Sequence, residues 1–83
     1  MQVFVYRSRR QADTYVYLRE RDAFACLPEA LANRLAPFDF ALEFALTPAR
    51  RLAREDPALV RQNLLARGFH LQLPPGEDPD APR

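Results

Sequence analysis

The sequence predicts an α+β fold, a two-layer α/β sandwich built on a mainly antiparallel four-stranded sheet. Four segments alternate apolar residues with a period of two, as strands do, and three others carry helix-start signals. The 83 residues, 48% hydrophobic and 28% charged, suffice for one core, so we expect a single domain over residues 1–75 and a flexible acidic tail over residues 76–83. The expected order is strand, strand, helix, strand, helix, helix, strand.

The first two expected strands are Gln2–Arg7 and Thr14–Arg19. In the first, Val3 and Val5 fall on one side and aromatic residues on the other, and the second repeats this alternation. The link Ser8–Asp13 is short and polar, which favours a hairpin connection. The sequence therefore predicts an antiparallel pair at the N-terminus.

The first expected helix runs from Pro28 to about Leu35. Proline suits the first helical position because it has no amide hydrogen to leave unpaired there. Leu27, Leu31 and Leu35 recur at four-residue spacing, which gives the helix an apolar stripe toward the core. Pro37 should end the helix, since it cannot donate the next backbone hydrogen bond.

The third expected strand covers residues 40–46. Large apolar side chains alternate there with alanine and glutamate, a period of two. The alternation predicts that one face of the strand packs in the core, namely Phe40, Leu42, Phe44 and Leu46.

Two helix-start signals follow this strand, each a capping residue before a proline. The capping oxygen accepts a hydrogen bond from an otherwise unpaired amide of the first turn. The signal at Thr47 predicts a short helix over Pro48–Arg54, anchored by Leu52. The signal at Asp56 predicts a longer helix over Pro57–Arg67.

The chain is expected to end its fold in a fourth strand, Phe69–Leu73. Gly68 suits the left-handed position that closes the preceding helix, in which Val60 and Leu64 lie one turn apart on the inner side. Pro74 and the proline after it have no amide hydrogen, so they should stop the pairing of the strand. The acidic tail that follows has no apolar anchor.

Composition excludes several classes of function. The formal net charge is +1 and the pI about 8.0, so the overall charge gives no reason to expect a nucleic acid or membrane partner. Cys26 is the only cysteine, which excludes an internal disulfide and a multi-cysteine metal site. No segment has the length of a membrane span, and two glycines cannot build a phosphate loop. We therefore expect a cytoplasmic protein with no cofactor, no metal site and no membrane contact.

The densest polar cluster lies at the end of the first strand and in the hairpin loop. Arginine, tyrosine and serine together can hold a phosphate and stack a base, so this hairpin face predicts a small noncatalytic binding domain for an anionic partner, with RNA as one candidate. The simpler alternative is a solvated turn whose arginines pair with Asp13, Glu20 and Asp22. The predicted binding residues are Tyr6, Arg7, Ser8, Arg9, Arg10, Tyr15 and Gln72.

Two other classes of function stay open. A protein-interaction or adaptor domain would use an exposed sheet edge or the fourth strand near Gln72. A small hydrolase would need Ser8, Cys26 or His70 as nucleophile or base. No acid stands at a diagnostic spacing from His70, so we expect a packing or surface histidine, a small core cysteine and no catalytic residue.

Short segments form a set that spans Met1 to about Pro75, namely Tyr6-Arg7-Ser8, Tyr15-Val16-Tyr17-Leu18, Leu27-Pro28-Glu29, Arg51-Leu52, Asp56, Val60, Leu64 and Gly68-Phe69-His70-Leu71-Gln72-Leu73-Pro74-Pro75. Their order and spacing resemble the YcgL domain proteins of gammaproteobacteria. Where that family often has an aromatic pair after the glycine, this chain has Phe69-His70. The resemblance implies a compact α/β domain with an antiparallel sheet, and it brings no established activity.

Overall fold

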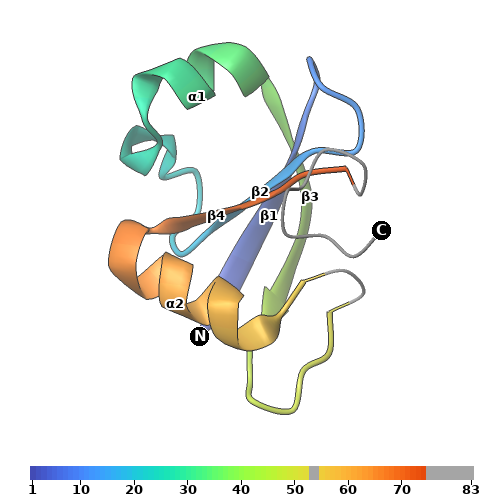
Figure 1. The fold of residues 1–83 in the computed structure, drawn as a ribbon, viewed down its shortest axis with the longest axis vertical. Helices are drawn as coiled ribbons and strands as arrows, with labels where there is room; N and C mark the ends of the chain where they lie inside the picture. The colour runs from blue at the N-terminus through green and yellow to red at the C-terminus, as the bar shows by residue number, and fades with distance from the viewer. Residues whose placement is uncertain (53–54, 75–83) are drawn as a thin grey trace.

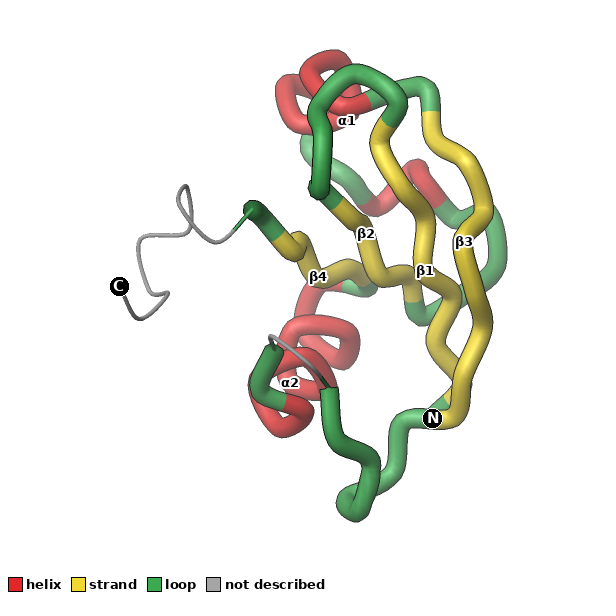
Figure 2. The backbone as a smooth tube through the Cα atoms, turned by 90° about the vertical axis from the view of Figure 1, so that its right-hand side faces the viewer, coloured by secondary structure: helices red, strands yellow, loops and turns green. Residues whose placement is uncertain are grey.

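The computed structural model describes residues 1–52 and 55–74. Its strands form one antiparallel sheet in the order β3-β1-β2-β4, which Figure 2 shows side by side. The strands are β1 (Gln2–Ser8), β2 (Tyr15–Leu18), β3 (Phe38–Ala45) and β4 (Phe69–Gln72). The predicted α+β class and its four-stranded antiparallel sheet are confirmed.

The predicted hairpin of β1 and β2 is present. Its register runs from Phe4 opposite Leu18 to Arg7 opposite Tyr15. The loop closes with a hydrogen bond from the Ser8 amide to the Thr14 carbonyl at 3.0 Å. Strand β3 pairs along the other side of β1, so β1 and β2 are the central strands.

The helices are a short 3-10 helix η1 (Phe24–Cys26), α1 (Glu29–Leu35) and α2 (Pro57–Arg67). Both ends of α2 follow the sequence signals. Asp56 accepts a hydrogen bond from the Ala58 amide at 2.9 Å, and Gly68 closes the helix with φ +83°. Within the part of the chain that the structure describes, no helix combines the length and the apolar content needed to cross a membrane.

The two α-helices cover opposite faces of the sheet. In Figure 1, α1 lies above β2 and β4, and α2 lies below them. Neighbouring strand residues point to opposite faces, so the core divides in two. The cluster against α2 contains Val3, Val5, Tyr17, Phe44, Leu46, Val60 and Leu64. The cluster against η1 and α1 contains Tyr6, Val16, Leu18, Leu27, Leu35 and Phe69.

This layering differs from the expected two-layer sandwich in one respect. A two-layer sandwich places its helices on one face, whereas this sheet has a cover on each face. The physical reason lies in the hairpin, where both sides of the strands are apolar: valines on one side of β1 and aromatic residues on the other. Leaving either side in water would forgo about 1.5–3 kcal/mol for each large side chain.

The helix predicted over Pro48–Arg54 is wrong for the residues that the structure describes. Pro48 and Ala49 form a single turn, which the Arg50 amide closes by donating to the Thr47 carbonyl at 3.0 Å. Residues 53–54 lie outside the described ranges. So short a helix depends on tertiary packing because its first turn is costly to nucleate. Here the Arg50 guanidinium stacks over the Phe44 ring at 4.8 Å instead.

The predicted core face of β3 is half wrong. Phe44 and Leu46 are buried, but Phe40 and Leu42 are 46% and 48% exposed. The register with β1 shifts between Val5 and Tyr6, a β-bulge. Beyond it, alternate side chains of β3 point to the opposite face of the sheet. The bulge moves only Phe40 to the α1 side, whereas Leu42 stays on the α2 side with Phe44 and is exposed on an edge strand. Simple alternation neither follows a bulge nor tells an edge strand from a central one. The predicted domain end at residue 75 and the predicted tail over residues 76–83 lie outside the described residues.

Candidate functional site

Ser8, one of the predicted binding residues, is buried and fully engaged inside the fold. Its hydroxyl donates to the Leu35 carbonyl at 2.6 Å and accepts from the Arg10 and Gln11 amides, each at 3.1 Å. These bonds join the hairpin loop to the last residue of α1. Ser8 therefore shapes the surface rather than contacting a ligand.

Tyr6 is also buried, on the α1 side of the sheet. Its hydroxyl donates to the Asp22 carboxylate and accepts from the Asp22 amide, both at 2.8 Å. Burial, together with the hydrogen bond to this carboxylate, raises the pKa of the Tyr6 phenol above its ordinary value. Tyr6 holds the turn before η1, and its ring is not presented to a partner.

Arg7 and Arg9 are exposed and share one carboxylate, Asp39 of β3. The Arg9 Nε lies 3.0 and 2.9 Å from the two Asp39 oxygens, and the Arg7 Nη2 lies 3.9 Å from Oδ2. The hydrogen bond from Arg9 lowers the pKa of the Asp39 carboxyl, and the same bond raises the pKa of the Arg9 guanidinium. The arginines are thus paired as the simpler alternative expected, but with Asp39 in place of the three acids it named.

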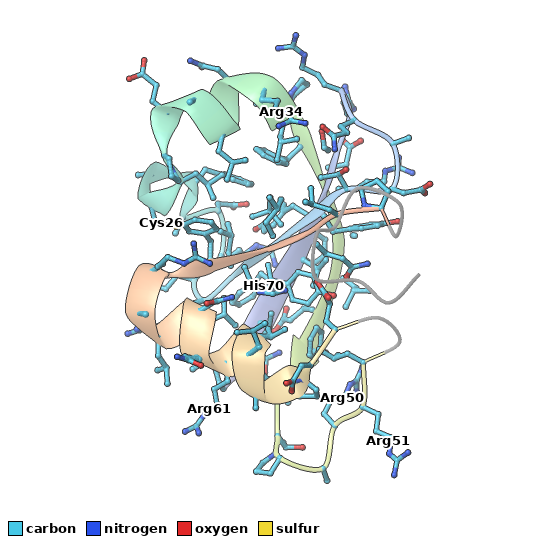
Figure 3. The ribbon with its side chains drawn as sticks, viewed as in Figure 1. Cys26, Arg34, Arg50, Arg51, Arg61 and His70 are labelled. Carbon is cyan, nitrogen blue, oxygen red and sulfur yellow. The ribbon has the colours of Figure 1, made fainter. Side chains whose placement is uncertain are left out.

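Arg10 reaches across to α1, where its Nη1 donates to the Asn33 carbonyl at 2.8 Å. This bond brings it close to Arg34, the residue after Asn33, which Figure 3 labels near the C-terminal end of α1. Arg34 has neither an ion pair nor a hydrogen bond among the described side chains. We call the surface formed by Arg7, Arg9, Arg10, Arg34 and Asp39 the hairpin end.

The remaining predicted residues, Tyr15 and Gln72, lie in one row with Arg7 across three strands. Arg7 is opposite Tyr15, and Tyr15 is opposite Gln72. Tyr15 packs half-buried against the α2-side cluster, and the Gln72 side chain accepts a hydrogen bond from the Tyr17 hydroxyl. The structure therefore brings Arg7, Tyr15 and Gln72 together on one face.

His70 is a packing histidine, as expected, but it has the acidic partner that the sequence did not reveal. Its Nε2 lies 2.9 Å from the Glu55 carboxylate and its Nδ1 lies 2.9 Å from the Asn63 amide. The side chains of His70 and Glu55 are only 7% and 11% exposed. Figure 3 shows His70 between the sheet and α2, so the cluster ties β4 to α2 and to the loop before it.

Cys26 ends η1 and is exposed, in contrast to the small core cysteine that was expected. Its thiol donates to the Ala23 carbonyl at 3.2 Å and borders an open depression of about 200 Å³ that Arg19, Glu20 and Gly68 also line. Partial burial raises the pKa of the Cys26 thiol, which keeps it protonated and a poor nucleophile at neutral pH.

The three residues considered for hydrolysis do not meet. Ser8 is bonded to α1 on one face of the sheet, whereas His70 packs with α2 on the other. Among the residues that the structure describes, no hydrogen bond joins Ser8, Cys26 or His70 to another of the three. A nucleophile and its base must lie within hydrogen-bond reach, so this arrangement gives no support to a Ser or Cys hydrolase.

Comparison with known proteins identifies the family. The YcgL domain profile matches residues 3–75. A YcgL domain-containing protein of Thioalkalivibrio sulfidiphilus is 53% identical over 75 residues, covering 90% of this chain and 93% of the relative. One from Xanthomonas axonopodis pv. citri is 55% identical over 74 residues, or 89% of this chain and 86% of the relative. The chain belongs to the YcgL domain family.

Membership of the YcgL family confirms the resemblance seen in the sequence, and the relatives are named only for the domain. A function for this chain must therefore be inferred from its own residues. Sequence reasoning missed Arg34 and Asp39 because each is isolated in the chain and reaches the hairpin only through folding. Glu55 and Asn63 were missed for the same reason, since α2 has to pack on β4 before His70 meets them.

Proposed function

We propose that this YcgL domain is a noncatalytic binding domain whose hairpin end holds an anionic partner, with the phosphate backbone of RNA as the candidate. One observation carries the proposal. Four guanidinium groups come to this end from β1, its loop and α1, and two of them contact the single carboxylate of Asp39. The excess of positive charge is local, because the whole chain has a net charge of only +1.

Arg10 and Arg34 are the groups best suited to meet the anion. Arg10 is bonded to a neutral carbonyl, which leaves its charge without a counterion among the described residues. Arginine binds phosphate oxygens through two parallel hydrogen bonds, and it does so more favourably than it binds a carbonyl. Asp39 has a different role, because it holds Arg7 and Arg9 side by side and keeps their positions fixed.

The test is a titration of labelled single-stranded and duplex RNA, followed by fluorescence anisotropy at several salt concentrations. Each phosphate contact releases counterions, so affinity should fall steeply as salt rises. The double variant Arg10→Gln with Arg34→Gln avoids the Asp39 pairs, and it should reduce the slope of log affinity against log salt by about one per arginine.

The matched control is Arg51→Gln with Arg61→Gln, which removes the same charge from exposed residues at the other end of the molecule (Figure 3). The control should keep most of the affinity. Equal losses in both double variants would mean that only overall charge matters. Binding that does not depend on salt, or no binding at low salt, would contradict the proposal.

A further inference from the structure

Strand β3 forms an open edge of the sheet. Over the residues that the structure describes it pairs with β1 alone, and at 8 residues it is the longest of the strands. The backbone groups on its outer side therefore have no strand to bond. Long exposed edges of this kind pair readily with a further strand unless charge or shape prevents it.

Two large apolar side chains stand out from this edge, one on each face. Phe40 is opposite Tyr6 and so lies on the α1 side, whereas Leu42 is opposite Val5 and lies on the α2 side. They are 46% and 48% exposed. A strand added to β3 would cover both, so the apolar burial and the main-chain hydrogen bonds would form in the same contact.

Two opposite charges lie beside this edge on the α1 side of the sheet. The Arg21 guanidinium lies 4.8 Å above the centre of the Phe40 ring. Glu43, opposite Phe4, lies on the same side of the sheet and is exposed. The two charges are not paired with each other: Glu43 accepts a hydrogen bond from Gln2 at 2.6 Å, and the Arg21 Nε lies 4.0 Å from the Asp22 carboxylate, an exposed pair at the limit of ion-pair distance.

We propose that β3 is an interface at which two copies of this chain pair antiparallel and continue the sheet. In the register that sets Ala41 opposite the partner's Leu42, Phe40 lies opposite the partner's Glu43. Arg21 then faces that carboxylate, and the two-fold symmetry repeats the contact. The side-chain contacts that carry this proposal involve none of the hairpin-end arginines, although Asp39 of the hairpin end also lies on β3.

The bulge favours a second copy over an unrelated strand. The bulge adds one residue, Ala41, to β3. As a result the even-numbered residues before Ala41 point to the α1 side of the sheet, and those after it point to the α2 side. In the proposed register the bulges of the two copies lie next to each other. Side chains of residues that are opposite each other therefore point to the same face of the sheet along the whole contact. A regular strand from another protein has no matching irregularity.

The experiment is sedimentation equilibrium of the full chain, with circular dichroism to verify folding of each variant. Wild type should pass from monomer to dimer at concentrations between about 10 µM and 1 mM. Glu43→Arg should weaken the dimer about tenfold or more, because it places like charges together. Combining it with Arg21→Glu should restore most of the affinity, which a general loss of stability would not allow.

Leu42→Lys should abolish the dimer, since a lysine on the edge opposes pairing. Its matched control is Leu65→Lys on α2, where the leucine is 52% exposed, and this variant should dimerise like wild type. A chain that stays monomeric at the highest concentration overturns the proposal. So does a dimer that Leu42→Lys leaves intact, or a charge-swapped double variant as weak as Glu43→Arg alone.

Discussion

Replacing Ser8 with alanine separates a structural role of this residue from a ligand-binding role. The hydroxyl makes three hydrogen bonds within the protein, so Ser8→Ala should destabilise the fold rather than alter a contact with a partner. Most of the loss in the free energy of unfolding should come from the Leu35 carbonyl, because its hydrogen bond from the hydroxyl is buried. A buried polar group left without a partner costs about 1–3 kcal/mol.

The two amides at Arg10 and Gln11 are only partly buried, so water can replace part of what they lose. Adding about 0.5 kcal/mol for each gives a total loss of about 2–4 kcal/mol in the free energy of unfolding. A domain of this size has roughly 4–12 kcal/mol in all. The variant should therefore still fold, but with a much smaller free energy of unfolding than wild type.

Urea unfolding followed by circular dichroism measures this loss. The matched control is Thr47→Ala, which removes an exposed hydroxyl and should change the stability by less than about 0.5 kcal/mol. Where Ser8→Ala is fully folded it should still bind RNA, because Ser8 positions the loop that carries Arg10 and is not itself a ligand contact. A loss below about 0.5 kcal/mol, or weaker binding without a loss of stability, would refute the structural role.

Two further predictions concern buried polar groups. Tyr6→Phe should cost about 1 kcal/mol at neutral pH. Because burial raises the pKa of Tyr6 above 10.0, the phenol stabilises the fold fully below that pH and loses this contribution as pH rises through the folded-state pKa, so the gap between wild type and variant should close in alkaline urea titrations. A constant gap would contradict this. His70→Ala leaves the largely covered Glu55 carboxyl group without its hydrogen-bond partner and should cost about 1–3 kcal/mol in urea unfolding. Glu55→Ala should lower that cost when combined with it, and purely additive losses would show that the two residues are not coupled.

Local signals in the sequence predicted most of the regular elements. The bounds of α2 were predicted to the residue, because the capping residue, the proline and the glycine act on the backbone within a few positions. The hairpin and the apolar stripe of α1 were also found, since both depend on spacing along a short segment. The helix expected after Thr47 is not formed by the described residues 48–52, since so short a helix depends on tertiary packing that the capping signal does not report.

The candidate site was only partly predictable. The sequence pointed to the hairpin, and the exposed Arg7, Arg9 and Arg10 are found there. It did not separate these residues from Tyr6 and Ser8, which the fold turns inward. Exposure depends on which face a helix covers. Tyr6 and Ser8 lie on the face that α1 covers, whereas Arg7, between them, points to the other face and is exposed.

What the sequence by itself determined is the strands, most of the helices, the fold class and the family. These follow from residue spacing and backbone preferences, which act locally. The tertiary structure alone decided that α1 and α2 take opposite faces, that Asp39 pairs with Arg9, and that His70 meets Glu55. The two side-chain pairs join residues 30 and 15 positions apart. The first pair forms only when β3 has paired with β1, and the second only when α2 has packed on β4, so no local pattern carries that information.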